Sequence, residues 1–177
     1  MAIKTNTGTM SKAFFGTSAV KKMYFGSSLV FSASTPYYTA GTENVDWIKG
    51  SSGGTVTFNT SSMYVSTSST QTAVDSYAVT NVLVNLTNIN TLKIDWAGSI
   101  YQQIIAGMYL CVSTTKLGTY GTYNARLYGG MASFARRTDS LDVSGLTGNY
   151  YLRIHAQKSS SSVVGSASLT IYNVWGE

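Results

Sequence analysis

The chain has 177 residues, enough for one good-sized domain or for one domain and a small module. Hydrophobic residues make up 44% of the chain, and charged residues make up 11%, compared with about 25% in an average protein. The high hydrophobic share excludes a disordered chain and supplies enough apolar side chains for a packed core. The net charge is +5, and residues 1–30 contribute most of it because they hold four lysines and no acidic residue.

A tandem repeat of ten residues opens the chain. Residues 11–20 and 21–30 each carry an aromatic pair, then glycine and small polar residues, then an aliphatic residue. Glycine followed by a small polar pair is typical of a tight turn, and the flanking residues favour strands. We expect an antiparallel β-meander over about 9–15, 19–25 and 28–32, with a leading strand at 2–4.

Alternation along these strands puts aromatic side chains on both faces of the meander. A sheet of three short strands is marginally stable alone, so another surface has to cover it. The covering surface could belong to the same domain, or the meander could be a docking module that a partner completes. In the docking reading, which we favour, the anchoring residues are Phe14, Phe15, Gly16, Val20, Lys22, Tyr24, Phe25, Gly26 and Val30.

The tandem segments 14–20 and 24–30, together with the C-terminal residues 169–177, resemble the beginnings and ends of structural proteins of tailed bacteriophages, especially tail, baseplate and fibre components. The resemblance implies a virion protein that binds other virion proteins and forms a homo-oligomer. The sequence shows no signal peptide and no apolar run long enough to cross a membrane, so we expect assembly in the cytoplasm of the host bacterium. Four N-terminal lysines are too few to indicate nucleic-acid binding, because lysines that protect sheet edges explain them equally well.

The domain boundary is predicted at the only proline, Pro36, with the docking module at 1–34 and a jelly-roll-like β-sandwich at 35–177. Period-2 alternation predicts strands at 55–59, 63–66, 78–86, 92–96, 103–112, 151–157 and 168–175. The alternation changes parity near Tyr172, which indicates a bulge. Residues 84–96 and 144–151 also resemble strand-and-turn elements of jelly-roll carbohydrate-binding modules.

The sequence offers no catalytic motif, and we expect a protein that is not an enzyme and needs no cofactor. His155, the single histidine, shares its predicted strand face with Arg153 and is expected to be solvated, whereas the single cysteine, Cys111, is expected to be buried. Zinc would need more His and Cys residues than the chain has. Four aspartates could bind calcium, namely Asp46, Asp95, Asp139 and Asp142. Each of them is more simply explained as a turn or strand-edge residue. Of the seven acids only Asp95 has core residues on both sides, so it is the acid whose change to Asn would test for hydrolase activity.

Aromatic residues supply the candidate ligand site. A glycine-rich stretch at 118–130 is predicted to be an exposed loop, and its tyrosines could stack on sugar rings, form a protein interface or simply pack under the loop. The residues proposed to bind a ligand are Trp47, Tyr120, Tyr123 and Tyr128. Two functions follow: a non-enzymatic virion protein whose sandwich decorates the particle, or a domain at a tail or fibre tip that binds a receptor or glycan on the host surface.

Overall fold

A computed structural model describes residues 13–15, 18–20, 22–25, 28–32, 34–67, 73–101, 106–116, 123–158 and 164–177. Up to residue 32 it describes strands and their pairing, and side-chain burial from residue 34 onward. Within these ranges all regular secondary structure is β-strand, and no helix capable of spanning a membrane is present in them. The predicted all-β class is therefore confirmed.

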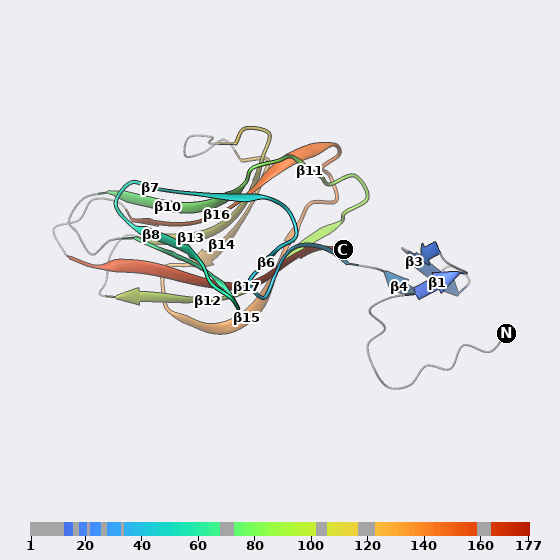
Figure 1. The fold of residues 1–177 in the computed structure, drawn as a ribbon, viewed down its shortest axis with the longest axis horizontal. Helices are drawn as coiled ribbons and strands as arrows, with labels where there is room; N and C mark the ends of the chain where they lie inside the picture. The colour runs from blue at the N-terminus through green and yellow to red at the C-terminus, as the bar shows by residue number, and fades with distance from the viewer. Residues whose placement is uncertain are drawn as a thin grey trace.

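The N-terminal repeat forms two hairpins, one for each copy. β1 (Ala13–Phe15) pairs with β2 (Ser18–Val20), and β3 (Lys22–Phe25) pairs with β4 (Ser28–Ser32), both antiparallel. The predicted meander is thus divided into two separate two-stranded sheets, because each copy pairs within itself at little loop-closure cost. In Figure 1 these hairpins lie to one side of the larger β-structure, near its C-terminal strand end.

Most of the proposed anchoring residues lie in these strands, whereas Gly16, Gly26 and the leading strand at 2–4 lie outside the described residues. The docking role of the repeat and the boundary between 34 and 35 stay predictions. β5 begins at Thr35, the first residue of the predicted sandwich.

Two antiparallel sheets form the sandwich (Figure 1). The first sheet has the order β14 (Ala125–Gly130), β13 (Ala106–Ser113), β16 (Asn149–Lys158), β10 (Val74–Thr80) and β7 (Trp47–Ser51), with β11 (Val84–Asn85) beside β16. The second sheet has the order β15 (Phe134–Asp142), β12 (Thr91–Tyr101), β17 (Ser166–Gly176), β5 (Thr35–Thr39) and β6 (Thr42–Glu43). β9 (Met63–Ser66) pairs with the first half of β17, and β8 (Thr55–Phe58) pairs with β9.

The core lies between the two sheets and follows the alternation of the sequence. In β12, Leu92, Ile94 and Trp96 are fully buried, and in β13 Met108, Leu110 and Val112 face the same core. A side chain such as Leu or Ile contributes roughly 1.5–3 kcal/mol when it is fully buried, so these alternating positions stabilise the pairing of the sheets. Period-2 patterning therefore explains which face of each strand points inward.

Two predicted elements differ from the structure. The predicted strand 78–86 is interrupted after Thr80, because Asn81 donates its backbone N–H to Asp46 O (2.7 Å) and its side-chain amide to Asp46 Oδ2 (2.6 Å). Val82, within the predicted strand, is 48% exposed in that interruption. The predicted loop at 118–130 ends earlier than expected, because residues 125–130 form edge strand β14.

Candidate functional site

A bulge in β17 gives the outer face of the second sheet an unusual set of side chains. Asp95 is opposite Asn173, but Trp96 is opposite Ile171, so Tyr172 is the extra residue in the ladder. Ile171 and Val174 are fully buried, and both residues between them are partly exposed on the other face. The bulge predicted from the parity change is confirmed, and it presents an aromatic ring and an amide side by side.

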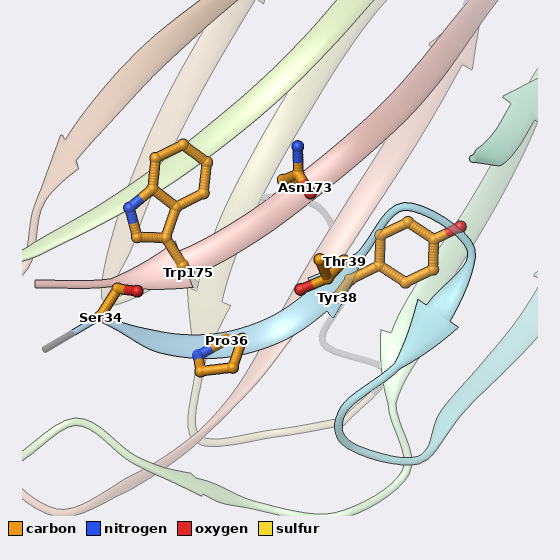
Figure 2. Close-up of a pocket in the computed structure, with 6 residues that line it drawn as sticks. All are labelled: Ser34, Pro36, Tyr38, Thr39, Asn173 and Trp175. Carbon is orange, nitrogen blue, oxygen red and sulfur yellow. The ribbon is translucent and has the colours of Figure 1, made fainter. Parts of the chain in front are cut away.

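A pocket of about 260 Å³ lies next to this bulge, between β17 and β5. Figure 2 shows Trp175 and Asn173 coming from β17, with Ser34, Pro36 and Thr39 along the neighbouring segment. The pairing explains the arrangement, because Trp175 is opposite Pro36 and Asn173 is opposite Thr39. The sixth lining residue, Tyr38, is fully buried. Such a pocket is smaller than a typical drug-sized site and suits one small polar ring.

The indole of Trp175 is held by hydrogen bonding. Its Nε1 donates to Glu177 Oε1 (2.8 Å), and Glu177 Oε2 pairs with Lys93 Nζ (2.6 Å). Burial opposes the ionisation of Glu177, but the hydrogen bonds from Lys93 and Trp175 outweigh it and lower the pKa of the carboxyl. Lys93 is directly opposite Trp175 in the sheet, so the ion pair fixes the indole in place.

A second ion pair lies beside Asn173. Arg136 binds Asp95 with two parallel bonds, Nε to Oδ1 (2.9 Å) and Nη2 to Oδ2 (2.6 Å), and Asn173 Nδ2 donates to Asp95 Oδ2 (3.0 Å). The hydrogen bond from Arg136 is the main cause of the lowered pKa of Asp95. The same guanidinium lies 3.8 Å from the ring centroid of Tyr172. Asp95 is thus ionised and fully engaged, an arrangement that suits positioning and does not suit general acid catalysis.

Asn173 keeps one polar atom available. Within the described part of the chain no hydrogen bond uses its Oδ1, whereas its Nδ2 is engaged by Asp95. Thr39 Oγ1 accepts from Asn44 Nδ2 (2.9 Å), so its hydroxyl proton can still donate. The pocket therefore offers an acceptor from Asn173, a donor from Thr39 and the hydroxyl of Ser34 beside an aromatic ring.

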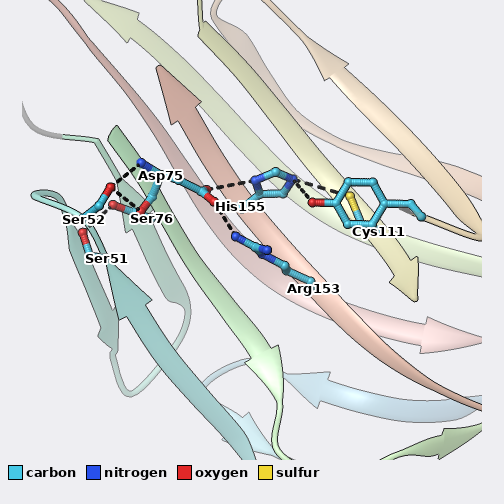
Figure 3. A network of polar contacts seen from close by, with 8 residues as sticks. Ser51, Ser52, Asp75, Ser76, Cys111, Arg153 and His155 are labelled. Carbon is cyan, nitrogen blue, oxygen red and sulfur yellow. Dashed lines mark hydrogen bonds and ion pairs between the residues drawn. The ribbon is translucent and has the colours of Figure 1, made fainter. Parts of the chain in front are cut away.

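A different polar network lies on the outer face of the first sheet (Figure 3). Asp75 pairs with Arg153 Nη2, and its Oδ1 lies 3.0 Å from His155 Nδ1. The other nitrogen of His155 lies 3.5 Å from Cys111 Sγ and 3.5 Å from Tyr123 OH. A cysteine, a histidine and an aspartate thus stand in the order that nucleophilic catalysis would use.

Because Cys111 and His155 are buried, their arrangement with Asp75 has a structural role. Cys111 is fully buried, and burial raises the pKa of its thiol to about 12, so the thiolate that would react is not formed. The expectation of a buried Cys111 is confirmed, but the expectation of a solvated His155 is wrong. His155 and Arg153 are 1% and 7% exposed, because His155 stacks on Tyr109 (4.8 Å between centroids) and has Tyr123 against it (6.0 Å).

Of the four aromatic residues predicted to bind a ligand, the three that the structure describes do not all lie together. Trp47 is 3% exposed and belongs to the core, where its Nε1 donates to Tyr37 O (3.0 Å), so its proposed ligand role is wrong. Tyr120 lies outside the described residues. Tyr123 packs against His155, and Tyr128 is 45% exposed and stacks on Tyr109 (5.1 Å between centroids).

The pocket residues Trp175 and Asn173 were missed by the sequence prediction. Two signals in the sequence mark them, namely the parity change at Tyr172 and the outward parity of Trp175 that follows from it. Pro36 and Thr39 could not have been paired with them, because their contact depends on which strand lies beside β17.

The candidate calcium ligands are used in separate contacts: Asp46 accepts from Asn81, Asp95 from Arg136, Asp139 from Trp96 and Arg137, and Asp142 from Ser144. A search of the described residues finds no group of three or more His, Cys, Asp or Glu side chains that could hold a metal ion.

The sequence matches no protein-family model and no curated protein. Among solved structures, the fold is similar to the glycoside hydrolase domain of Endo-D from Streptococcus pneumoniae, with a TM-score of 0.53 and 14% identity over 74% of this chain, which spans only 21% of that chain. It is also similar to a variant of the family 29 carbohydrate-binding module CBM29-2, with a TM-score of 0.46 and 10% identity over 82% of this chain and 92% of that one. Another CBM29-2 variant, solved with cellulohexaose, has a TM-score of 0.46 and 11% identity over 81% and 89% of the two chains. At these identities the likeness concerns the fold.

Proposed function

We propose that the sandwich is a non-enzymatic carbohydrate-binding domain, and that the pocket at Trp175 and Asn173 receives a sugar ring. The observation that carries the proposal is a fixed, partly exposed indole next to an available amide oxygen on an open sheet face. Sugar rings have apolar C–H faces that pack on an aromatic ring and hydroxyls that bond to amide and hydroxyl groups. The pocket supplies both kinds of contact in the space of one ring.

The proposed ligand class is the one in the name of the family 29 carbohydrate-binding modules. The likeness does not carry the argument, because its TM-scores are below 0.5 and similar sandwiches host unrelated functions. The proposal that the chain is not an enzyme has separate support. Asp95 is held ionised by Arg136, and the buried thiol of Cys111 has a raised pKa.

The proposal is tested with the full chain on an array of bacterial cell-wall glycans and plant and fungal polysaccharides. Trp175→Ala should abolish retention of any glycan that the wild-type protein binds. Tyr151→Ala is the matched control, because Tyr151 is a partly exposed aromatic residue on the opposite sheet and should be replaceable without loss of binding. Failure of the wild-type protein to bind any glycan on the array would contradict the proposal.

We further propose that this domain belongs to a tailed-bacteriophage virion protein whose N-terminal hairpins attach it to other virion proteins or to further copies of itself. Besides the sequence resemblance, the observation that favours this role is that the hairpins pair only within themselves among the described strands and add no strand to either sheet of the sandwich. The mass of the assembled protein in solution, compared with a chain that starts at Thr35, tests it. An unchanged mass after truncation would contradict the anchoring role.

A further inference from the structure

We infer that the ligand of the second sheet is an uncharged polysaccharide that lies along β17, from the Trp175 pocket toward Tyr64 on β9. This inference rests on the proposed carbohydrate-binding function and adds the chemical class of the ligand and the extent of the site. The residues that support the inference lie on the outer face of the second sheet, beyond the pocket.

That outer face is uncharged over its far half. Strand pairing places Ser99, Ser168, Ser66 and Thr55 in one row across β12, β17, β9 and β8. The next row is Ala97, Thr170, Tyr64 and Thr57, on the same four strands. All of these residues are exposed or partly exposed, so the rows form a polar surface with one aromatic ring. Hydroxyl groups both donate and accept hydrogen bonds, as sugar hydroxyls do.

The charges beside the pocket are already neutralised. Lys93 is 2.6 Å from Glu177, and Arg136 is 2.6 Å from Asp95. An acidic sugar residue or a phosphate would have to compete with these carboxylates for the cations, whereas a neutral sugar leaves both pairs intact. The pocket itself is lined by uncharged residues only. The charge pattern therefore favours an uncharged ligand.

The aromatic residues set the length of the site. Strand geometry separates Trp175 from Thr170, the residue opposite Tyr64, by about 15 Å, which exceeds one sugar ring. The ring of Tyr172 lies between them, and the guanidinium of Arg136 occupies one face of this ring. Trp175 and Tyr64 then contact separate residues of one chain, which favours a polysaccharide over a single sugar.

Affinity electrophoresis and titration calorimetry of the full chain test the inference. The probes are the neutral polysaccharides dextran, mannan, galactomannan and mixed-linkage glucan, and the anionic polygalacturonate, alginate and wall teichoic acid. We expect binding to at least one neutral chain, with Kd changing by less than about twofold between 50 and 500 mM NaCl, because no ion pair forms with the ligand. Trp175→Ala should weaken that binding by at least about thirtyfold and Tyr64→Ala by about fivefold.

Each alternative result of the binding test contradicts a specific part of the inference. Binding restricted to anionic chains, weakened by salt and lost in Trp175→Ala, overturns the uncharged ligand and leaves the carbohydrate site in place. Binding to a neutral chain that Trp175→Ala abolishes and Tyr64→Ala leaves unchanged overturns the extended site alone. No binding to any probe contradicts the proposed function and the inference together. Tyr151→Ala, on the opposite sheet, should bind as the wild-type protein does.

Discussion

Asp75→Asn should destabilise the protein strongly although Asp75 is far from the proposed site. The carboxylate of Asp75 is the described ion-pair partner of Arg153, whose side chain is 8% exposed, and it also accepts from His155 Nδ1. Asn is nearly isosteric but neutral, so the substitution removes the negative charge that Asp75 places beside a buried guanidinium. Removal of one partner from a buried pair costs about 3–5 kcal/mol, and because Asp75 itself is 31% exposed we expect about 2–3 kcal/mol here.

Urea unfolding followed by tryptophan fluorescence measures the effect. The midpoint should fall with an unchanged slope, because the exposed surface on unfolding is the same. Arg153→Met removes the charge and keeps much of the packing on Tyr77, whose ring lies 4.1 Å from the guanidinium. The double variant Asp75→Asn with Arg153→Met should therefore be more stable than the sum of the single effects predicts, by about 1–2 kcal/mol.

A loss below about 0.5 kcal/mol in Asp75→Asn, the range of an ordinary surface substitution, would refute the reasoning. Asp46→Asn is the control, since Asp46 is exposed and bonds only to Asn81 among the described side chains. That control should remain within this range.

Three other predictions concern buried groups. Burial lowers the pKa of His155 below its ordinary value of about 6.5, so the unfolded chain binds the proton more readily than the folded one. The free energy of unfolding should therefore fall as the pH drops from 7 to 5. Urea titrations at each pH measure this dependence, and His155→Gln should flatten it. The thiol of Cys111 is fully buried with its pKa raised to about 12, so Ellman's reagent should react with it only after denaturation, and fast labelling of the native protein would contradict the burial. Trp96→Phe should cost about 2 kcal/mol in thermal or urea unfolding, because it loses the bond from Nε1 to Asp139 Oδ2 (2.8 Å) and leaves space in the core, and a neutral effect would contradict that packing.

Local periodicity was enough to predict the class of the fold and the inward faces of many strands. Alternation predicted the strand at 92–96, in which Leu92, Ile94 and Trp96 are buried, and a parity change revealed the bulge at Tyr172. These features depend on neighbours in the sequence, so they can be seen in it. The split of the N-terminal ribbon into two hairpins is also local, and the ten-residue repeat could have indicated it.

The site depends on contacts between distant strands, and these were not predictable from one sequence. Trp175 meets Pro36 only because β5 lies beside β17, and Asp95 meets Arg136 only because β15 lies beside β12. The same reason explains the error at His155. Its alternation correctly put it outside the core, but Tyr109 from the next strand and Tyr123 cover it. A position that faces outward in a strand is solvated only if nothing else packs on that face.

The most direct test of the account is the affinity of the full chain for its best-bound glycan before and after Trp175→Ala, measured by titration calorimetry at one salt concentration. The account predicts a loss of at least about thirtyfold in affinity with an unchanged unfolding midpoint, because the indole lies on the outer face of its sheet and outside the core. Unchanged affinity in a folded Trp175→Ala protein would contradict the assignment of the pocket as the sugar site.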